Sequence, residues 1–236
     1  MVADLTAIFY TSNHMEGHFI DKVKEQLLRA LGQYPLVSVS QKPMHFGENI
    51  CVGDVGRSHL NIYRQILIGC KAAKTKYVAM TEDDILYSGA HFREKRPDPG
   101  YLLYDMYKWS IFTWSKTPIF SLRRRLVVNH LIAEREFLIE ALQERFDLYN
   151  CEDFGSDESH VNLSYWGDPG RYENHLGVTV RPTQEFYATV PGVVFSHPGA
   201  FGYTTRGEKK KLADERAQEI PHWGTAENML KEYYYG

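Results

Sequence analysis

The first 84 residues alternate between short apolar-rich runs and amphipathic segments, and this alternation constrains the fold more than any other feature. Runs at residues 5–10, 36–39 and 77–80 have the length and composition of strands. Between them, apolar side chains recur at helical spacing over residues 17–31 and 58–73. Because strands joined by helices form right-handed crossovers, this pattern predicts a parallel sheet with helices packed on it.

Composition limits the class of protein. Of the 236 residues, 43% are apolar and 24% are charged, which is typical of a globular domain and excludes a disordered, collagen-like or coiled-coil chain. No apolar run exceeds four residues and no signal-peptide pattern precedes the first strand, so we expect neither a membrane span nor secretion. Three cysteines without CxxC spacing indicate reduced thiols. A cytoplasmic protein is therefore expected.

The chain beyond residue 90 is less regular, although some elements can still be predicted. Apolar spacing predicts a helix over residues 134–146, and an apolar run predicts a strand over residues 190–195. A short helix is expected at the C-terminal end, whereas the glycines within residues 43–57 predict a loop. We expect one α/β domain, in which a mostly parallel, Rossmann-type sheet is flanked by helices and followed by an irregular second half.

Three consecutive acidic residues come directly after the third predicted strand. Glu82, Asp83 and Asp84 would lie at the carboxyl edge of the sheet, where parallel sheets bind ligands. Their charges repel one another unless a cation lies between them, and a hard divalent ion can bridge carboxylates to a diphosphate. An acid-rich, solvated turn would explain the same residues. The cluster alone leaves both interpretations open.

Residues 58–84 taken together resemble a segment of the nucleotide-sugar-dependent glycosyltransferases of the GT-A fold, especially their large inverting family. That family has an arginine-containing helix, a glycine one turn later, an apolar strand and an Asp-x-Asp motif. The matching positions in this chain are Arg64, Gly69, residues 77–80, Asp83 and Asp84. Gln65 replaces the usual Asn, and Thr81 stands at the usual first Asp. The likeness covers roughly residues 5–86.

The resemblance implies a GT-A-like fold in which residues 1–90 bind the nucleotide sugar and residues 91–236 bind the acceptor. It also implies metal-dependent transfer from a nucleoside-diphosphate sugar, with UDP as the expected nucleotide and Mn²⁺ or Mg²⁺ as the expected ion. The implied metal ligands are Glu82, Asp83, Asp84 and His197. His197 follows the predicted strand at residues 190–195 and precedes a proline, a setting in which a histidine is often structural.

The same resemblance assigns residues to the nucleotide and the diphosphate. The exit of the first strand would bind base and ribose through Thr11 and Asn13, and Arg64 would lie near the diphosphate. A glycine- and cation-rich loop over residues 202–211 would offset the negative charge of the leaving diphosphate. The implied cations of that loop are Arg206, Lys209 and Lys210. Each assignment has a structural alternative. Thr11 and Asn13 could form a helix N-cap, Arg64 could be a surface arginine, and the cations of the loop could form a solvated run.

Glycosyl transfer with inversion needs a base that deprotonates the acceptor hydroxyl. The related enzymes carry a Glu-Asp pair at a helix start in this part of the chain, which implies Glu152 and Asp153 as candidates. Asp157 follows closely and is a third candidate. Acids that cap a helix would account for the same residues equally well.

The acceptor half contains aromatic rings interleaved with cations over residues 107–125. These rings could stack sugars or bases, or they could form a core with a solvated rim. The small size also resembles bacteriophage enzymes that glycosylate hydroxylated DNA bases, so the expected acceptor is such DNA, a glycan or a small molecule, and the compartment would then be the host cytoplasm. With a formal charge of −3, DNA binding would need a local basic patch. A DNA- or carbohydrate-binding module without catalysis and a two-carboxylate glycoside hydrolase are the alternatives.

Overall fold

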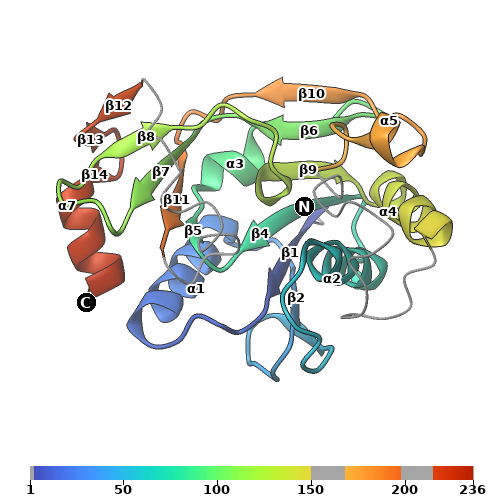
Figure 1. Ribbon diagram of the computed structural model, residues 1–236, viewed down its shortest axis with the longest axis horizontal. Helices are drawn as coiled ribbons and strands as arrows, with labels where there is room; N and C mark the ends of the chain where they lie inside the picture. Colours follow the sequence, from blue (N-terminus) through green and yellow to red (C-terminus); the bar gives the residue numbers. More distant parts are fainter. Residues whose placement is uncertain (1–2, 150–167, 198–214, 236) are drawn as a thin grey trace.

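The computed structural model describes residues 3–149, 168–197 and 215–235, and a seven-stranded sheet runs through its centre (Figure 1). The strand order is β10-β6-β9-β4-β1-β2-β3. The strands are β1 (Leu5–Thr11), β2 (Leu36–Ser40), β3 (Glu48–Cys51), β4 (Tyr77–Glu82), β6 (Leu102–Asp105), β9 (Leu131–Glu134) and β10 (Thr183–Phe186). Only β9 runs against its neighbours β4 and β6. The mostly parallel α/β sheet predicted from the sequence is confirmed.

Two apolar cores cover the two faces of this sheet. Along β1, Ala7 and Phe9 pack on the side of α1 (His18–Leu31), whereas Ile8 and Tyr10 pack on the side of α2 (His59–Ala72) and α4 (Arg135–Tyr149). This alternation follows from the two-residue period of a strand. Gly69 lets α2 approach β1, since a Cβ at this position would lie 2.4 Å from a methyl group of Ile8.

A second sheet lies beside the first, on the α1 side, and carries much of the second half of the chain (Figure 1). Its order is β12-β8-β7-β11-β5. The strands are β5 (Ile85–Leu86), β7 (Lys108–Phe112), β8 (Phe120–Leu122), β11 (Gly192–Ser196) and β12 (Arg216–Ala217). β11 pairs parallel with β7 and antiparallel with β5, which directly follows the acidic cluster. The end of β11 is thereby brought next to the end of β4.

Short elements complete the described structure. They are α3 (Gly89–Arg93), the 3₁₀ turn η1 (Val128–His130), α5 (Glu173–Leu176), the β13–β14 hairpin (Glu219–Ile220 and Gly224–Thr225), α7 (Ala226–Met229) and the π-helical η4 (Leu230–Tyr235). In Figure 1 the C-terminal helix lies beside α1, against which η4 packs. Within the described ranges, every helix is too short or too polar to span a membrane.

The helices expected at residues 17–31, 58–73 and 134–146 and the strand at 190–195 are present as α1, α2, α4 and β11. The loop expected over residues 43–57 is wrong in part, because β3 lies within it. β3 is an edge strand that pairs only with β2, and its four side chains are exposed or half-buried. Such a strand has little apolar pattern to signal it.

Candidate functional site

A polar pocket opens at the carboxyl edge of the seven-stranded sheet, where β1, β2 and β4 end together. It holds about 610 Å³ of space, part of it open to solvent. Its lining residues are Tyr10, Thr11, Ser12, His14, Met15, Gln41, Gly56, Arg57, Ser58, Asn61, Ile62, Gln65, Glu82, Asp83, Asp84 and His197. All three carboxylates of the acidic cluster therefore reach one pocket, at the edge predicted for ligand binding.

Glu82 is held by two hydrogen bonds at the floor of this pocket. The Tyr10 hydroxyl donates to Glu82 Oε1 at 2.7 Å, and Asn129 Nδ2 donates to Glu82 Oε2 at 2.7 Å. Burial raises the pKa of Glu82 to about 7, although both hydrogen bonds oppose the shift. The nearby Asp83 charge adds to the rise in that pKa. Glu82 is thus fixed in place by its neighbours.

Asp83 is bound to the end of β1. The Thr11 hydroxyl donates to Asp83 Oδ2 at 2.5 Å, and Thr11 Oγ1 in turn accepts the Asn13 backbone N–H at 2.8 Å. Burial raises the pKa of Asp83, whereas the Thr11 hydrogen bond and the charges of Arg57 and His14 act to lower it. Thr11 therefore joins the two strand ends as well as lining the pocket.

Asp84 and His197 meet at the opposite end of the acidic cluster. His197 Nε2 lies 3.8 Å from Asp84 Oδ2. The Phe195 N–H donates to the Asp84 carbonyl at 2.9 Å, so pairing between β5 and β11 sets this approach. The His197 ring packs against Phe19 and Tyr234, with ring centroids 5.8 and 6.2 Å away, and these two rings also contact each other at 5.4 Å. The position of His197 is therefore restrained by a cluster of three aromatic rings.

The donor set of Asp84 and His197 fits a manganese or magnesium ion. Carboxylate oxygen and imidazole nitrogen are suitable ligands for these ions. Two ligand bonds of about 2.1 Å can span up to about 4.2 Å, which accommodates the 3.8 Å separation of Nε2 and Oδ2. Among the described residues, no three His, Cys, Asp or Glu side chains are grouped as a complete metal site. Substrate oxygens and water would have to complete the coordination.

Two residues expected at the nucleotide lie outside the pocket lining. Asn13 Oδ1 accepts the backbone N–H groups of Gln41 and Lys42, both at 2.8 Å, and thereby holds the loop after β2. Its φ of 54° is a left-handed conformation that asparagine adopts more readily than most residues. The Arg64 guanidinium lies 5.3 Å from the Phe146 ring centroid, on the side of α4.

Sequence reasoning missed two residues of the pocket lining, the cation Arg57 and the imidazole of His14. Arg57 comes directly before Ser58, the N-cap of α2, whose hydroxyl accepts the Asn61 N–H at 3.1 Å. A cation beside a helix start at the carboxyl edge of a sheet is a signal that could have been used. Gln65, at the position that departs from the glycosyltransferase pattern, donates to the carbonyls of Thr11 and Val39 at 3.0 and 3.3 Å.

Six of the expected site residues lie outside the described ranges. They are the candidate bases Glu152, Asp153 and Asp157 and the loop cations Arg206, Lys209 and Lys210. Their roles stay predictions from the sequence.

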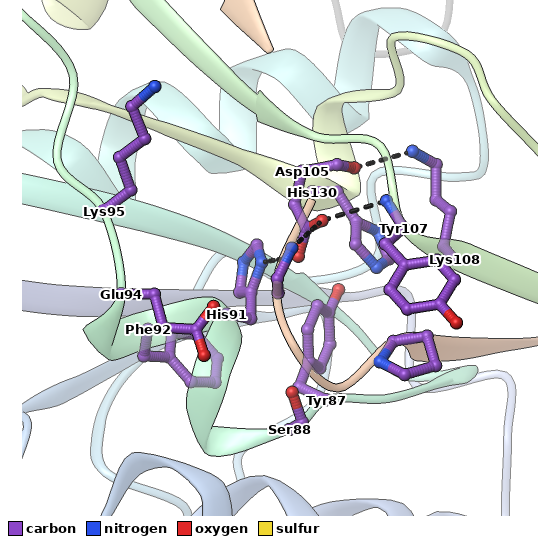
Figure 2. Close-up of polar contacts among 12 residues, drawn as sticks. Tyr87, Ser88, His91, Phe92, Glu94, Lys95, Asp105, Tyr107, Lys108 and His130 are labelled. Carbon is purple, nitrogen blue, oxygen red and sulfur yellow. Dashed lines mark hydrogen bonds and ion pairs between the residues drawn. The ribbon is translucent and has the colours of Figure 1, made fainter. Parts of the chain in front are cut away.

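A second group of ionisable side chains is buried behind the pocket floor. Figure 2 shows Asp105 between His91 and Lys108: Asp105 Oδ2 lies 3.0 Å from His91 Nδ1, and Lys108 Nζ donates to the Asp105 carbonyl at 2.9 Å. Burial lowers the pKa of Lys108 to about 8 and lowers that of His130 well below its usual value. His130 Nδ1 lies 2.9 Å from Asn129 Oδ1, so Asn129 connects this buried cluster to Glu82.

The aromatic segment of the second half is mostly core. Trp109 and Phe112 are 7% and 0% exposed, and Lys108, the first residue of β7, is also buried. Trp114 differs, because 41% of its surface is exposed. The rings over residues 107–125 therefore do not form one continuous recognition surface, and only Trp114 among the tryptophans of this segment is open to a ligand.

Comparisons with known proteins give no family. No protein-family model and no curated protein matches the chain. Solved structures with similar chain courses include a nucleotidyl transferase from Methanothermobacter (13% identity, 79% of this chain and 88% of that one, TM-score 0.42). A Drosophila β1,4-galactosyltransferase 7, in complex with manganese, UDP-Gal and xylobiose, has 13% identity over 90% of this chain and 78% of its own, with a TM-score of 0.43.

The glycosyltransferase GlyE of Streptococcus pneumoniae has 12% identity over 78% of this chain, with a TM-score of 0.46. This chain spans 45% of the length of GlyE. Identities and TM-scores this low describe a partial likeness in chain course and assign no activity. Any functional conclusion therefore depends on the residues of the pocket.

Proposed function

We propose that this protein is a metal-dependent glycosyltransferase that moves a sugar from a nucleoside-diphosphate sugar, expected to be a UDP-sugar, to a hydroxyl group. The observation that carries the proposal is the position of the acidic cluster. Glu82, Asp83 and Asp84 line a pocket at the carboxyl edge of a parallel sheet, and Asp84 lies 3.8 Å from His197. This combination of carboxylates and imidazole in an open pocket suits a cation together with an anionic ligand.

Charge in the pocket supports a diphosphate ligand. Three carboxylates alone would repel a diphosphate, so it can bind there only if positive charge is added. An ion held by Asp84 and His197 would offset the negative charge of the diphosphate and of the nucleotide as it leaves. Arg57 and His14 line the same pocket, and their N–H groups would donate hydrogen bonds to phosphate oxygens. The ion and Arg57 would together supply the positive charge that a diphosphate needs.

The proposed reaction breaks the bond between the anomeric carbon of the sugar and a phosphate oxygen, which leaves with the electron pair. A new bond forms between the anomeric carbon and the acceptor oxygen, and the hydroxyl proton passes to a base. We assign that base to the group of Glu152, Asp153 and Asp157. Arg206, Lys209 and Lys210 would offset charge on the departing diphosphate.

The decisive experiment is a calorimetric titration with UDP, GDP, CDP, ADP and dTDP, each with Mn²⁺ and with a chelator. We expect one nucleotide to bind only when the metal is present, and Asp84→Asn to abolish this metal-dependent binding. Asp21→Asn, an exposed carboxylate on α1, is the matched control and should bind as the wild type does. The proposal is refuted if no diphosphate binds under either condition.

Two other outcomes would favour the alternative functions. Cleavage of glycosides without nucleotide or metal would indicate a two-carboxylate hydrolase. Binding of DNA or glycan that survives Asp84→Asn, without any nucleotide binding, would indicate a non-catalytic binding module. The acceptor itself is proposed to be a hydroxylated DNA base, a glycan or a small molecule, and the surface beside His197 helps to discriminate among these classes.

A further inference from the structure

Two exposed aromatic side chains project from adjoining segments beside the end of β11. Trp114 is 41% exposed and Tyr235 is 60% exposed. The Tyr235 hydroxyl donates to the Thr113 carbonyl at 2.9 Å, which ties the C-terminal helix to the turn that carries Trp114. The Thr113 N–H donates to the Ser196 carbonyl at 3.1 Å. The Tyr235 ring is therefore bonded to Thr113, the neighbour of Trp114, and Thr113 is in turn paired with Ser196, the residue before His197.

This corner adjoins the pocket through Tyr234. The Tyr234 ring lies 6.2 Å from the His197 ring and 5.3 Å from the Tyr235 ring, and it also contacts Phe19 of α1 at 5.4 Å. His197 lines the pocket. Figure 1 shows the C-terminal helix next to α1 and near β11, as these contacts require. Tyr234 thus connects the exposed Tyr235 ring to a residue of the pocket lining.

We propose that Trp114 and Tyr235, here called the aromatic platform, bind a saccharide ring of the acceptor. The proposal deepens the glycosyltransferase function proposed above and rests on it. Aromatic faces carry partial negative charge and attract the weakly positive C–H groups on the face of a sugar ring. The sugar hydroxyls at the rim stay free for water or polar groups. The platform would thus hold an acceptor beside the pocket without desolvating its hydroxyls.

Charge around the platform favours a neutral saccharide over DNA. Lys231 is paired with Glu227 at 2.7 Å, and Arg124 is paired with Glu215 at 2.8 Å. Among the described residues, Lys116 and Glu232 are exposed with opposite charges, and the Arg123 guanidinium lies 5.6 Å from the ring of Phe112, which contacts Trp114. DNA binding depends on cations that neutralise successive phosphates. The described charges beside the platform are of both signs and form no continuous basic track.

The size of the platform fits a small ligand better than a protein. Two partly exposed aromatic side chains offer about 200 Å² of contact surface. A stable protein interface buries about 800 Å² on each partner. One or two sugar rings match the available area.

The proposal is tested by saturation-transfer NMR and calorimetry with cellobiose, lactose and chitobiose, in the presence of Mn²⁺ and the nucleotide that binds. We expect at least one disaccharide to bind the wild type, with little change between about 50 and about 500 mM NaCl. Trp114→Ala and Tyr235→Ala should each weaken this binding about tenfold. Tyr235→Phe, which keeps the ring but loses the bond to Thr113, should weaken it less.

Tyr187→Ala is the matched control, because Tyr187 is 53% exposed and is not part of the platform. Disaccharide binding that is absent in the wild type, or unchanged in both alanine variants, overturns the platform. So does salt-sensitive binding of a single-stranded DNA 12-mer that Trp114→Ala abolishes. Nucleotide binding is measured in the same samples, so a wild type that binds no diphosphate refutes the proposed function separately from the platform.

Discussion

The pocket and the buried cluster behind it contain similar residue types in different surroundings. In the pocket, Glu82, Asp83 and Asp84 face a space that a ligand can enter. In the buried cluster, the Lys108 ammonium donates to the Asp105 carbonyl, and both residues are at most 2% exposed. The difference teaches that ionisable groups indicate function only where a ligand can reach them. The same groups enclosed by protein contribute to stability and to its dependence on pH.

The largest expected effect is in the pocket. Asp84→Asn keeps the shape of the side chain but removes the charge that would hold an ion. We expect turnover to fall by about 1,000-fold, equivalent to about 4 kcal/mol, because charge on the leaving diphosphate is no longer offset. The measurement is a radiolabelled sugar-transfer assay, with circular dichroism to confirm folding. Full turnover in this variant would remove Asp84 from the site.

In the buried cluster, the expected effect is on stability. Asp105→Ala removes the acceptor for His91 and for the N–H groups of Tyr107 and Ala188. We expect the free energy of unfolding to fall by about 3 kcal/mol, because buried polar groups lose their partners. Urea unfolding measures this loss, and Asp21→Ala on the surface is the control. A variant as stable as the wild type but unable to bind nucleotide would contradict the comparison.

Lys108 of the buried cluster should make the stability of the protein depend on pH. Its pKa is lowered to about 8 in the folded protein, whereas the unfolded chain has the usual value of about 10.5, so the unfolded state binds more protons between these values. Stability should therefore rise with pH from about 8 to about 10.5, by up to about 1.4 kcal/mol per pH unit. Lys108→Met should remove this contribution. Thermal unfolding of both proteins across this range tests the prediction; parallel curves would contradict it.

The smallest expected effect is on nucleoside-diphosphate affinity, and it differs between Arg57 and Arg64. Arg57→Gln should weaken nucleoside-diphosphate binding about tenfold, because Arg57 lines the pocket. Arg64→Gln should leave that affinity unchanged, because the Arg64 guanidinium packs over Phe146. Calorimetry on both variants sharpens the comparison, and the reverse order of effects would restore the role that the sequence implied for Arg64.

These arginines also show what could be predicted from sequence. The strands and helices of the first half were predictable because each has a strong apolar period. His197 could be singled out because it follows an apolar strand, and it lines the pocket. Arg64 lies outside the pocket lining, beside Phe146 of α4, a contact with a distant part of the chain that the sequence around Arg64 does not reveal. Asn13 was expected at the nucleotide, but it holds Gln41 and Lys42, a tertiary contact that no local pattern reveals.

The Asn129 amide fixes the direction of hydrogen bonds on both sides. Because Nδ2 donates to Glu82, Oδ1 must accept from His130, so the His130 proton lies on Nδ1 and Nε2 carries a lone pair. Nε2 faces Gly192, where a Cβ would lie 2.5 Å away. An alanine at position 192 would press on the His130 ring, and the tautomer of His130 depends on the Asn129 amide. Substitutions at positions 129, 130 and 192 should therefore be coupled in their effects rather than independent.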